Sequence, residues 1–535
     1  MGVRGRYRGF GPAAVSVFLG LLLLTSVFLV PGFSSVSGRS SHTGVASLAD
    51  PDPSALRGAA AVSLIMSAAS ADAPAYLGVI ATVLVGSSPG SSAYDSSNGL
   101  VYVTNEYSDS VSVISGTSVV ASVNVGTEPA GATFDSGNGY VYVSNLGSDN
   151  VSVISGTTVI ATVGVGSAPF VYPASYDNGN GYVYVANTGS GTVSVIDGTS
   201  VVSGGTITVG ADPDWVTYDS GNGYVYVPNY DSDTVSVISG TSVVATVPVG
   251  SLPGRVVCDS ETGFVYVANY GSNNVSVLNG TSVVGTIPVG SEPGIEAYAS
   301  GNGYVYVANQ GSGTVSAISD LSAVATIIVG SEPSDVMYDN GNGYIYVSNY
   351  DSGNVSAISG TTVVGSVSVG TYPGSLADDG GNGYVYVPNY GSESVSVIQT
   401  SYSVTFTENG LPNGATWYVN VSGQPGLSAT VGRGAGTQLS TYLPDGSYTY
   451  GVTTNEKNWT AATTGSFAVF AVSESPTAVS MSFTSTPTST SSSGLAWWIY
   501  AVIAIVIVVI VAAVVMVVLM RRKPRTPLHP GPPVT

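Results

Sequence analysis

The chain has 535 residues, only 8% of which are charged, and it carries 32 acidic against 12 basic side chains. The formal net charge of −20 repels phosphate and argues against a nucleic-acid partner. The single cysteine, Cys258, excludes a disulfide framework and a zinc cluster built on thiolates. An apolar content of 44% is enough for a core, so global disorder is not expected.

The N-terminus combines Arg4, Arg6 and Arg8 with an apolar run over 13–30. This order is typical of a secretory signal, but the run is long for one. Residues 1–33 are therefore expected to be either a cleaved signal peptide or an uncleaved signal anchor. Residues 34–76 follow as a Ser/Ala-rich tether without a strand pattern.

A string of the form Gly-Tyr-Val-Tyr-Val-x-Asn, or a close variant, recurs eight times in the middle of the chain. Short Val- and Tyr-rich runs that alternate with period 2 indicate strands and exclude helical repeats of similar length. A period of 40–42 residues is typical of the four-stranded blades of a β-propeller. The closing asparagines are Asn105, Asn145, Asn187, Asn229, Asn269, Asn309, Asn349 and Asn389.

The fifth copy predicts the strands of one blade over 254–258, 264–268, 274–278 and 282–288. Paired tyrosines such as Tyr140 and Tyr142 are expected to fill the wedges between blades. A fourth-strand pattern over 78–85 precedes the first complete unit, and the last unit lacks a fourth strand. The N-terminal strand should therefore complete the last blade, which gives eight blades over 77–400 and seals the sheet edges. A seven-bladed ring with one displaced unit is the alternative.

These residues resemble the YVTN-type β-propeller repeat of archaeal and bacterial surface-layer proteins. The resemblance rests on Tyr-Val-Tyr-Val-x-Asn, a third strand of the form Val-Ser-Val-Ile, and Val-Gly-x-x-Pro, and it spans about 78–400. It implies a cell-surface protein of archaeal type. Similar propellers serve as surface coats, adhesins or enzyme scaffolds, so the resemblance does not fix an activity.

Residues 401–484 contain about seven short strand patterns and resemble the small Ig-like β-sandwich modules of archaeal surface proteins, with Trp417 as the core aromatic residue. Residues 485–494 form a Ser/Thr-rich stalk. Residues 495–520 lack any charge over a length that crosses a bilayer, which predicts a transmembrane helix. The basic residues of 521–535 then place this tail in the cytoplasm and the bulk of the chain outside the cell.

No catalytic or cofactor-binding residues are predicted. His42 and His529 lie outside the repeats, so the ring has no histidine to act as a base. An aspartate does recur at one turn position, where its carboxylate is expected to accept main-chain N–H groups. These residues are Asp95, Asp135, Asp177, Asp219, Asp259, Asp339 and Asp379, with Ala299 in the remaining copy.

Calcium is the functional alternative for acidic turns, because carboxylate and carbonyl oxygens suit this ion. The best local candidates are Asp109 beside Glu106, and Asp231 with Asp233, although none has the spacing of a dedicated calcium loop. Six Asn-x-Ser/Thr sequons are candidates for N-glycosylation. They begin at Asn150, Asn274, Asn279, Asn354, Asn420 and Asn458.

A binding site is expected where the repeat loses its symmetry. The breaks are residues 170–173, Asp214–Trp215, Arg255 and the inserted Gly204–Gly205. Trp215 and Arg255 fall at related early positions of adjacent blades, so they are the candidate binding residues at the central channel or one of its mouths.

The sequence therefore predicts a single-pass membrane protein with a non-enzymatic structural, adhesion or partner-binding role at the cell surface. Its expected partners are a glycan, the cell wall or another surface protein. The alternative is an extracellular propeller hydrolase or lyase of the lactonase-like type, which an Asp/Glu cluster around the channel would support.

Overall fold

The computed structural model describes residues 76–169, 175–380, 383–409, 414–422, 427–430, 438–444, 446–454, 459–461, 464–469 and 477–485. The expected signal segment, the membrane segment, the cytoplasmic tail and the symmetry break at 170–173 lie outside these residues. The described part of the chain contains no helix with the length and apolarity needed to span a bilayer.

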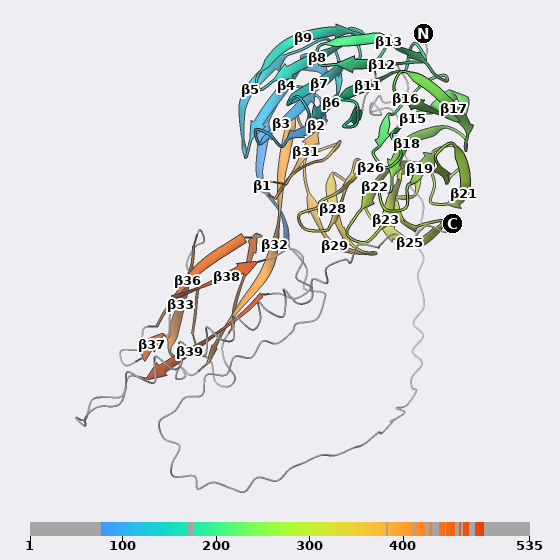
Figure 1. The fold of residues 1–535 in the computed structure, drawn as a ribbon. Coiled ribbons are helices and arrows are strands. Elements are labelled where there is room, and N and C mark those ends of the chain that lie inside the picture. Colours follow the sequence, from blue (N-terminus) through green and yellow to red (C-terminus); the bar gives the residue numbers. More distant parts are fainter. Residues whose placement is uncertain are drawn as a thin grey trace, which may run out of the picture.

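Four-stranded antiparallel sheets stand side by side in a ring around a central channel (Figure 1). Blade 1 contains β2 (Pro89–Asp95), β3 (Leu100–Asn105), β4 (Ser110–Ser115) and β5 (Ser118–Asn124), and blade 2 contains β6 (Pro129–Asp135), β7 (Tyr140–Asn145), β8 (Asn150–Ser155) and β9 (Thr158–Gly164). Blade 3 contains β10 (Ser175–Asp177), β11 (Tyr182–Asn187), β12 (Thr192–Asp197) and β13 (Ser200–Thr208), and blade 4 contains β14 (Thr217–Asp219), β15 (Tyr224–Asn229), β16 (Thr234–Ser239) and β17 (Ser242–Pro248). Blade 5 contains β18 (Pro253–Cys258), β19 (Phe264–Asn269), β20 (Asn274–Asn279) and β21 (Ser282–Pro288), and blade 6 contains β22 (Pro293–Ala299), β23 (Tyr304–Asn309), β24 (Thr314–Ser319) and β25 (Ser322–Ile328). Blade 7 contains β26 (Pro333–Tyr338), β27 (Ile345–Asn349), β28 (Asn354–Ser359) and β29 (Thr362–Ser368). Three short 3₁₀ turns, η1 (Glu106–Ser108), η2 (Tyr230–Ser232) and η3 (Gln310–Ser312), follow motif asparagines.

Blade 8 is assembled from both ends of the repeat region. It contains β30 (Ala377–Asp379), β31 (Tyr384–Asn389) and the first half of β32 (Ser394–Asn409), and β1 (Tyr76–Leu84) supplies its outer strand. The β1–β32 pair is antiparallel, with Tyr76 opposite Ser401 and Leu84 opposite Ser394. The predicted eight blades and their closure by the N-terminal strand are thus confirmed, and the seven-bladed alternative is wrong.

The strands predicted for blade 5 agree with the observed ones to within one residue at each end. The glycine that ends each first hairpin has a positive φ, 76° at Gly139 for example, as the Asn-Gly pattern predicts. The inserted Gly204–Gly205 lies in β13, where the β12–β13 register shifts between Ser194 and Ile196. A bulge therefore absorbs the two extra residues without disturbing the ring.

Valine and tyrosine side chains fill each wedge between adjacent blades, as the alternation predicts. In the wedge between blades 1 and 2, Val143 and Ile154 are fully buried against the side chain of Tyr102. The second tyrosine of each motif also forms a hydrogen bond to the next blade. In seven motifs its hydroxyl donates to a turn carbonyl there, and in blade 7 the hydroxyl of Tyr346 pairs with the hydroxyl of Thr400. Tyr142 reaches Gly198 at 2.9 Å, and Tyr386 reaches Gly116 at 3.0 Å across the closure. Each such bond adds about 0.5–1.5 kcal/mol of stability.

The closing asparagine of each motif is a structural residue. Asn309 is fully buried, and its amide donates to the hydroxyls of Thr314 and Ser316, both at 3.0 Å. The linker glycine Gly290 packs on the same amide so closely that a Cβ there would lie 2.7 Å from it. This contact explains why the linker before each blade contains a glycine and the second strand of the blade ends in an asparagine.

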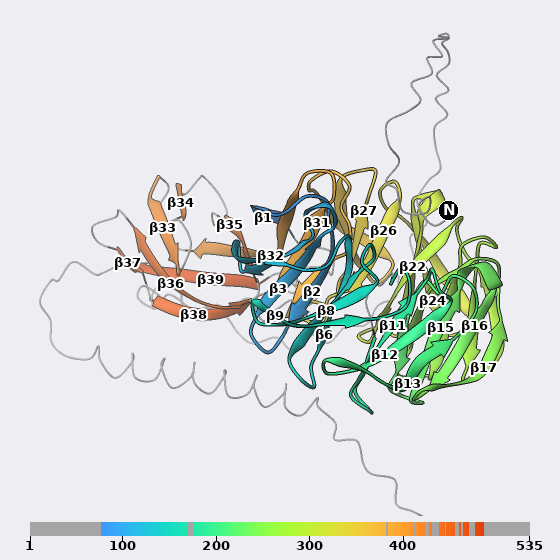
Figure 2. The ribbon, with the colours of Figure 1, turned by 90° about the horizontal axis from the view of Figure 1, so that it is seen from above.

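The second half of β32 enters a two-sheet module that extends from the edge of the ring (Figure 2). One sheet has β34 (Leu427–Thr430), β33 (Thr416–Val421), β36 (Gly446–Thr454) and β38 (Thr464–Val469), and the other joins β32 to β35 (Gln438–Pro444), β39 (Thr477–Ser485) and β37 (Trp459–Ala461). Trp417 is fully buried, together with Phe406 and Leu443, so its predicted place in the core is confirmed. Because one strand serves both parts, the module continues the hydrogen-bonded ladder of blade 8.

Candidate functional site in the central channel

The recurrent turn aspartates stabilise the blades. Asp177 Oδ1 accepts the N–H of Gly179 at 2.8 Å, and the same turn recurs at Asp95, Asp135, Asp219, Asp259 and Asp339. The hydroxyl of Tyr218 in the next blade also bonds to Asp177. Where Ala299 replaces the aspartate, Tyr338 Oη accepts the N–H of Gly301 at 3.1 Å instead.

The proposed calcium candidates hold linkers between blades. Asp109 has a left-handed backbone (φ 49°), and its Oδ1 accepts the N–H of Glu128 at 3.0 Å. Asp233 makes the same contact to Leu252 at 2.8 Å, and Asp231 lies two residues earlier in η2. In the part of the chain that the structure describes, no three His, Cys, Asp or Glu residues are grouped so that they could hold a metal ion. Calcium binding remains a prediction without a geometric site.

The sequons differ in accessibility. Three of them begin β8, β20 and β28, and there the carboxamide is half-buried and accepts a hydrogen bond from the motif asparagine at 2.7–2.8 Å. These are Asn150, Asn274 and Asn354. Asn279 and Asn420 are exposed, and Asn458 lies outside the described residues.

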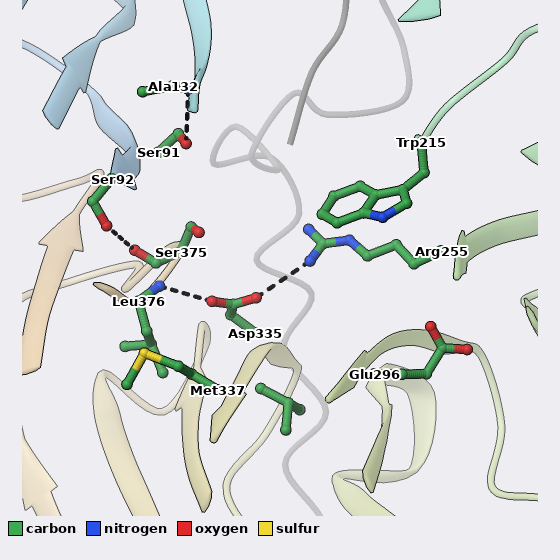
Figure 3. A pocket seen from close by; sticks show the side chains of 11 residues that line it. Ser91, Ser92, Ala132, Trp215, Arg255, Glu296, Asp335, Met337, Ser375 and Leu376 are labelled. Atoms are coloured by element: carbon green, nitrogen blue, oxygen red, sulfur yellow. Dashed lines mark hydrogen bonds and ion pairs between the residues drawn. The ribbon is translucent and has the colours of Figure 1, made fainter. Parts of the chain in front are cut away.

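A cavity of about 200 Å³ lies where the innermost segments of the blades converge (Figure 3). Its lining divides into two unlike halves. Blades 4 to 7 contribute Trp215, Arg255, Glu296 and Asp335, whereas blades 8, 1 and 2 contribute mostly serine and alanine, including Ser92. The charged and aromatic groups are thus gathered on one side of a ring that is otherwise nearly symmetric.

Arg255 is held from two sides. Its Nη1 lies 3.2 Å from Asp335 Oδ1, and its guanidinium carbon lies 4.2 Å from the centroid of the Trp215 ring. Figure 3 shows the guanidinium between the indole and the carboxylate. Asp335 Oδ2 also accepts the N–H of Leu376 at 2.7 Å, and Trp215 Nε1 donates to Thr217 at 2.9 Å. The cation is therefore fixed in position by an ion pair and a cation–π contact.

Burial dominates the electrostatics of both carboxyl groups. It raises the pKa of Asp335 even though Arg255 and two main-chain N–H groups favour the charged form. It raises the pKa of Glu296 well above that of an ordinary glutamate, and Arg255 offsets only part of this effect. Burial also raises the pKa of the nearby Cys258 thiol, with a contribution from the charge of Glu296.

Glu296 occupies a position that the adjacent blades 5 and 7 use for apolar packing. It lies opposite Val307 in β22–β23, as Val256 lies opposite Val267 and Val336 opposite Val347. Those two valines are only 4% and 6% exposed and belong to wedge cores. Both carboxyl oxygens of Glu296 are buried, and among the described residues the main-chain N–H of Ala268 is the hydrogen-bonding group that favours its charged form.

Trp215 and Arg255, the two residues that the sequence singled out, are in direct contact at this cavity. Asp335 and Glu296 were missed, although the sequence contains a signal for both. Every blade enters the channel after a linker proline, and these residues follow Pro333 and Pro293 by two and three positions. Comparing only those two positions between repeats would have identified all four side chains.

Comparisons with known proteins find the same fold and no family. Neither the protein-family models nor the curated proteins match the chain. Among solved structures, virginiamycin B lyase from Staphylococcus aureus is 10% identical, with a TM-score of 0.43 over 61% of this chain and 99% of that one. Kuenenia stuttgartiensis hydrazine synthase is 18% identical (TM-score 0.41, 58% and 95%), and the WD40 propeller domain of Doa1 is 12% identical (TM-score 0.42, 60% and 96%). Likeness at this level reflects the propeller fold and indicates no activity.

Proposed function

We propose that this chain is a membrane-anchored cell-surface protein whose propeller binds a ligand at its central cavity without transforming it. The observation that carries the binding role is the cluster of Trp215, Arg255, Asp335 and Glu296 on one side of the channel. Protein stability gives no evident reason for it, because buried ion pairs contribute little and a second buried carboxyl group without its own cation is destabilising. Residues that break the repeat pattern and lower stability are expected at a functional site, because function then explains why they are kept.

The surface location is supported by the sequence. The N-terminal signal pattern, the apolar segment 495–520 and its basic flank favour export with a membrane anchor. The resemblance to surface-layer repeats agrees with this arrangement. A glycan, a cell-wall component or an exposed group of another surface protein are the ligands expected in that setting.

The test uses the full-length protein in detergent and a cell-wall fraction. Ser92→Leu places a large side chain on the small-residue half of the cavity, and leucine already occupies the equivalent position in blade 8 as Leu376. Ser92→Ala is the matched control, because it removes the same hydroxyl without filling space. Loss of retention on the fraction with leucine, but not with alanine, would support binding at the cavity. Equal retention of both variants would refute it.

A hydrolase or lyase is the second candidate, and one observation favours it. The raised pKa of Glu296 would suit a general acid, and the adjacent Arg255 could stabilise a developing negative charge. Product formation from lactone or ester substrates that ceases in Glu296→Gln would establish this alternative over pure binding.

A further inference from the structure

Four tyrosine side chains form a continuous strip on the face of the ring where the linkers between blades run. The rings of Tyr350 and Tyr372 are stacked with their centroids 4.7 Å apart, and those of Tyr107 and Tyr390 meet edge to face at 6.2 Å. The two pairs are joined through the main chain, because the N–H of Tyr390 donates to the carbonyl of Tyr372 at 2.9 Å. This tyrosine strip therefore runs across blades 7, 8 and 1, over the closure of the ring.

Two members of the strip stand where the other blades have smaller residues. Tyr107 is 63% exposed, and the equivalent position holds glycine in five blades and aspartate in two. Tyr372 is 40% exposed and has a left-handed backbone (φ 56°), a conformation that disfavours bulky side chains. The other linkers have at this position Ser88, Glu128, Ala168, Asp212, Leu252, Glu292 and Glu332. The blades therefore fold without an aromatic residue at either position, and exposed rings held against backbone preference indicate an interaction surface.

Carboxyl groups flank the tyrosine strip. The hydroxyl of Tyr390 bonds to Glu106. At the other end of the strip, Glu332 and Asp351 hydrogen-bond to each other, so two carboxyl groups lie in contact there. Burial, followed by the negative charges of Asp351 and Glu292, raises the pKa of Glu332. A cation brought to this end of the strip would relieve the repulsion between the carboxylates.

The propeller has almost no positive charge of its own to place there. Residues 76–400 contain 25 acidic side chains and a single basic one, Arg255. Arg255 is held in the channel, with its guanidinium between the Trp215 ring and the carboxylate of Asp335. The tyrosine strip presents the same two kinds of group, aromatic rings and carboxylates, on the surface of the ring. Its chemistry therefore matches a guanidinium that comes from another molecule.

We propose that the tyrosine strip is a docking surface for an arginine-rich extended segment of a partner protein. Its guanidinium groups stack on the tyrosine rings and pair with Glu106, Glu332 and Asp351. Arginine suits the strip better than lysine, because a planar guanidinium stacks on aromatic faces and forms two parallel bonds with a carboxylate. A neutral glycan would also stack on the rings, but it would leave the negative charge beside them unmatched. The strip shares no residue with the cavity lining, so this proposal does not depend on ligand binding in the channel.

The experiment is a fluorescence anisotropy titration of the full-length protein, in an uncharged detergent, with a labelled peptide of alternating arginine and serine. Peptides of the same length with lysine or glutamine in place of arginine test the role of the cation, and labelled chitotetraose tests a glycan. The arginine peptide should bind more tightly than the lysine peptide, and the glutamine peptide should not bind. Affinity for the arginine peptide should fall at least tenfold between 0.1 and 1 M NaCl, as the Debye length decreases from about 10 Å to about 3 Å.

The double variant Tyr107→Gly, Tyr372→Leu removes both exposed rings and leaves the net charge unchanged. Glycine and leucine already occupy these positions in other blades, as in Gly271 and Leu252, so the variant should fold. Its affinity for the arginine peptide should be about tenfold lower, because two cation–π contacts are lost. Tyr418→Ala is the matched control, since Tyr418 is 41% exposed and lies in β33 of the two-sheet module. This control should bind the peptide as the wild type does.

Undiminished peptide binding by the double variant would overturn the assignment, because the overall negative charge alone would then account for the attraction. Salt-independent binding of chitotetraose that the double variant loses would overturn the partner class in favour of a glycan. Absence of arginine-peptide binding at 0.1 M NaCl would overturn the docking surface itself. Ser92→Leu should leave the peptide affinity unchanged, and a loss in that variant would place the peptide in the cavity instead of on the strip.

Discussion

Replacing Glu296 with valine should stabilise the protein, and the structure supplies the magnitude. An incompletely satisfied buried polar group costs about 1–3 kcal/mol, and the two carboxyl oxygens of Glu296 are buried with only the main-chain N–H of Ala268 bonding to them in the described residues. Valine fits the position, since Val256 and Val336 occupy it in the adjacent blades at 4% and 6% exposure. The smaller side chain leaves a void that offsets part of the gain. The net increase in the free energy of unfolding should be about 1–2 kcal/mol near pH 4, where the carboxyl is largely protonated in both the folded and the unfolded chain.

The gain should depend on pH in a defined direction. In the unfolded chain the Glu296 carboxyl titrates near its ordinary pKa of about 4.3, whereas in the folded protein its pKa is raised. Between these two values the unfolded state loses the proton and the folded state keeps it, so the wild-type protein loses about 1.4 kcal/mol per pH unit. The valine variant has no such group. The difference in the free energy of unfolding between the valine variant and the wild type should be smallest below about pH 4. It should grow as pH rises to the folded-state pKa of Glu296.

The assay is thermal and urea unfolding of full-length wild-type and variant proteins from pH 4 to 8. Glu296→Gln is the first control, because it should show no titration while keeping an unsatisfied polar group. Val336→Glu is the reciprocal control and should destabilise the protein by a similar amount. A lower midpoint for Glu296→Val at pH 7 would refute the reasoning, since it would mean that the carboxylate is satisfied in the folded protein.

Four further predictions concern other parts of the ring. Arg255→Leu should cost about 3–5 kcal/mol because it leaves Asp335 without its cation, and adding Asp335→Leu should recover most of that loss in urea unfolding. Gly290→Ala should lower the unfolding midpoint by several degrees because its Cβ would overlap the motif asparagine, whereas alanine at the solvent-facing Gly164 should not. Burial and neighbouring carboxylates raise the pKa of Asp378 to about 7, so Asp378→Asn should remove the part of the stability loss between about pH 4 and pH 7 that this carboxyl contributes. If the chain is glycosylated, Asn279→Gln should remove one glycan by mass spectrometry, and the half-buried sequons that begin strands should be unmodified.

The ring itself could be predicted from the sequence because each of its determinants repeats. Eight copies of one strand pattern fix the strand boundaries, and the unpaired first strand pattern fixes the closure. The structural tasks of the repeated residues follow from chemistry that is local to each repeat or joins neighbouring repeats in a fixed way. Asp177 bonding to Gly179 is one example, and Tyr142 bonding to Gly198 is another.

The sequence predicted two of the four charged or aromatic residues in the cavity, and the other two could be recognised only from the folded ring. Trp215 and Arg255 are conspicuous because tryptophan and basic residues are rare in this chain, while acidic residues are common in its turns. Asp335 therefore resembled another turn residue until the ring brought it within 3.2 Å of Arg255, 80 residues away in sequence. Glu296 was hidden by the same abundance, since only the strand register shows that it replaces a core valine.

The residues that break the repeat pattern at the inner positions of the blades lie close together in space. This grouping favours one shared site over unrelated substitutions that the fold merely tolerates. A ring of near-identical blades offers the same inner positions in every repeat, and the charged and aromatic residues that line the cavity come from adjacent blades 4 to 7. They also meet in space, with Arg255 joining Trp215 to Asp335. Substitutions that arose independently would not be expected to contact one another, and each new charge would then be buried without an oppositely charged partner. Convergence of these replacements on one shared cavity is instead what selection for a single site would produce.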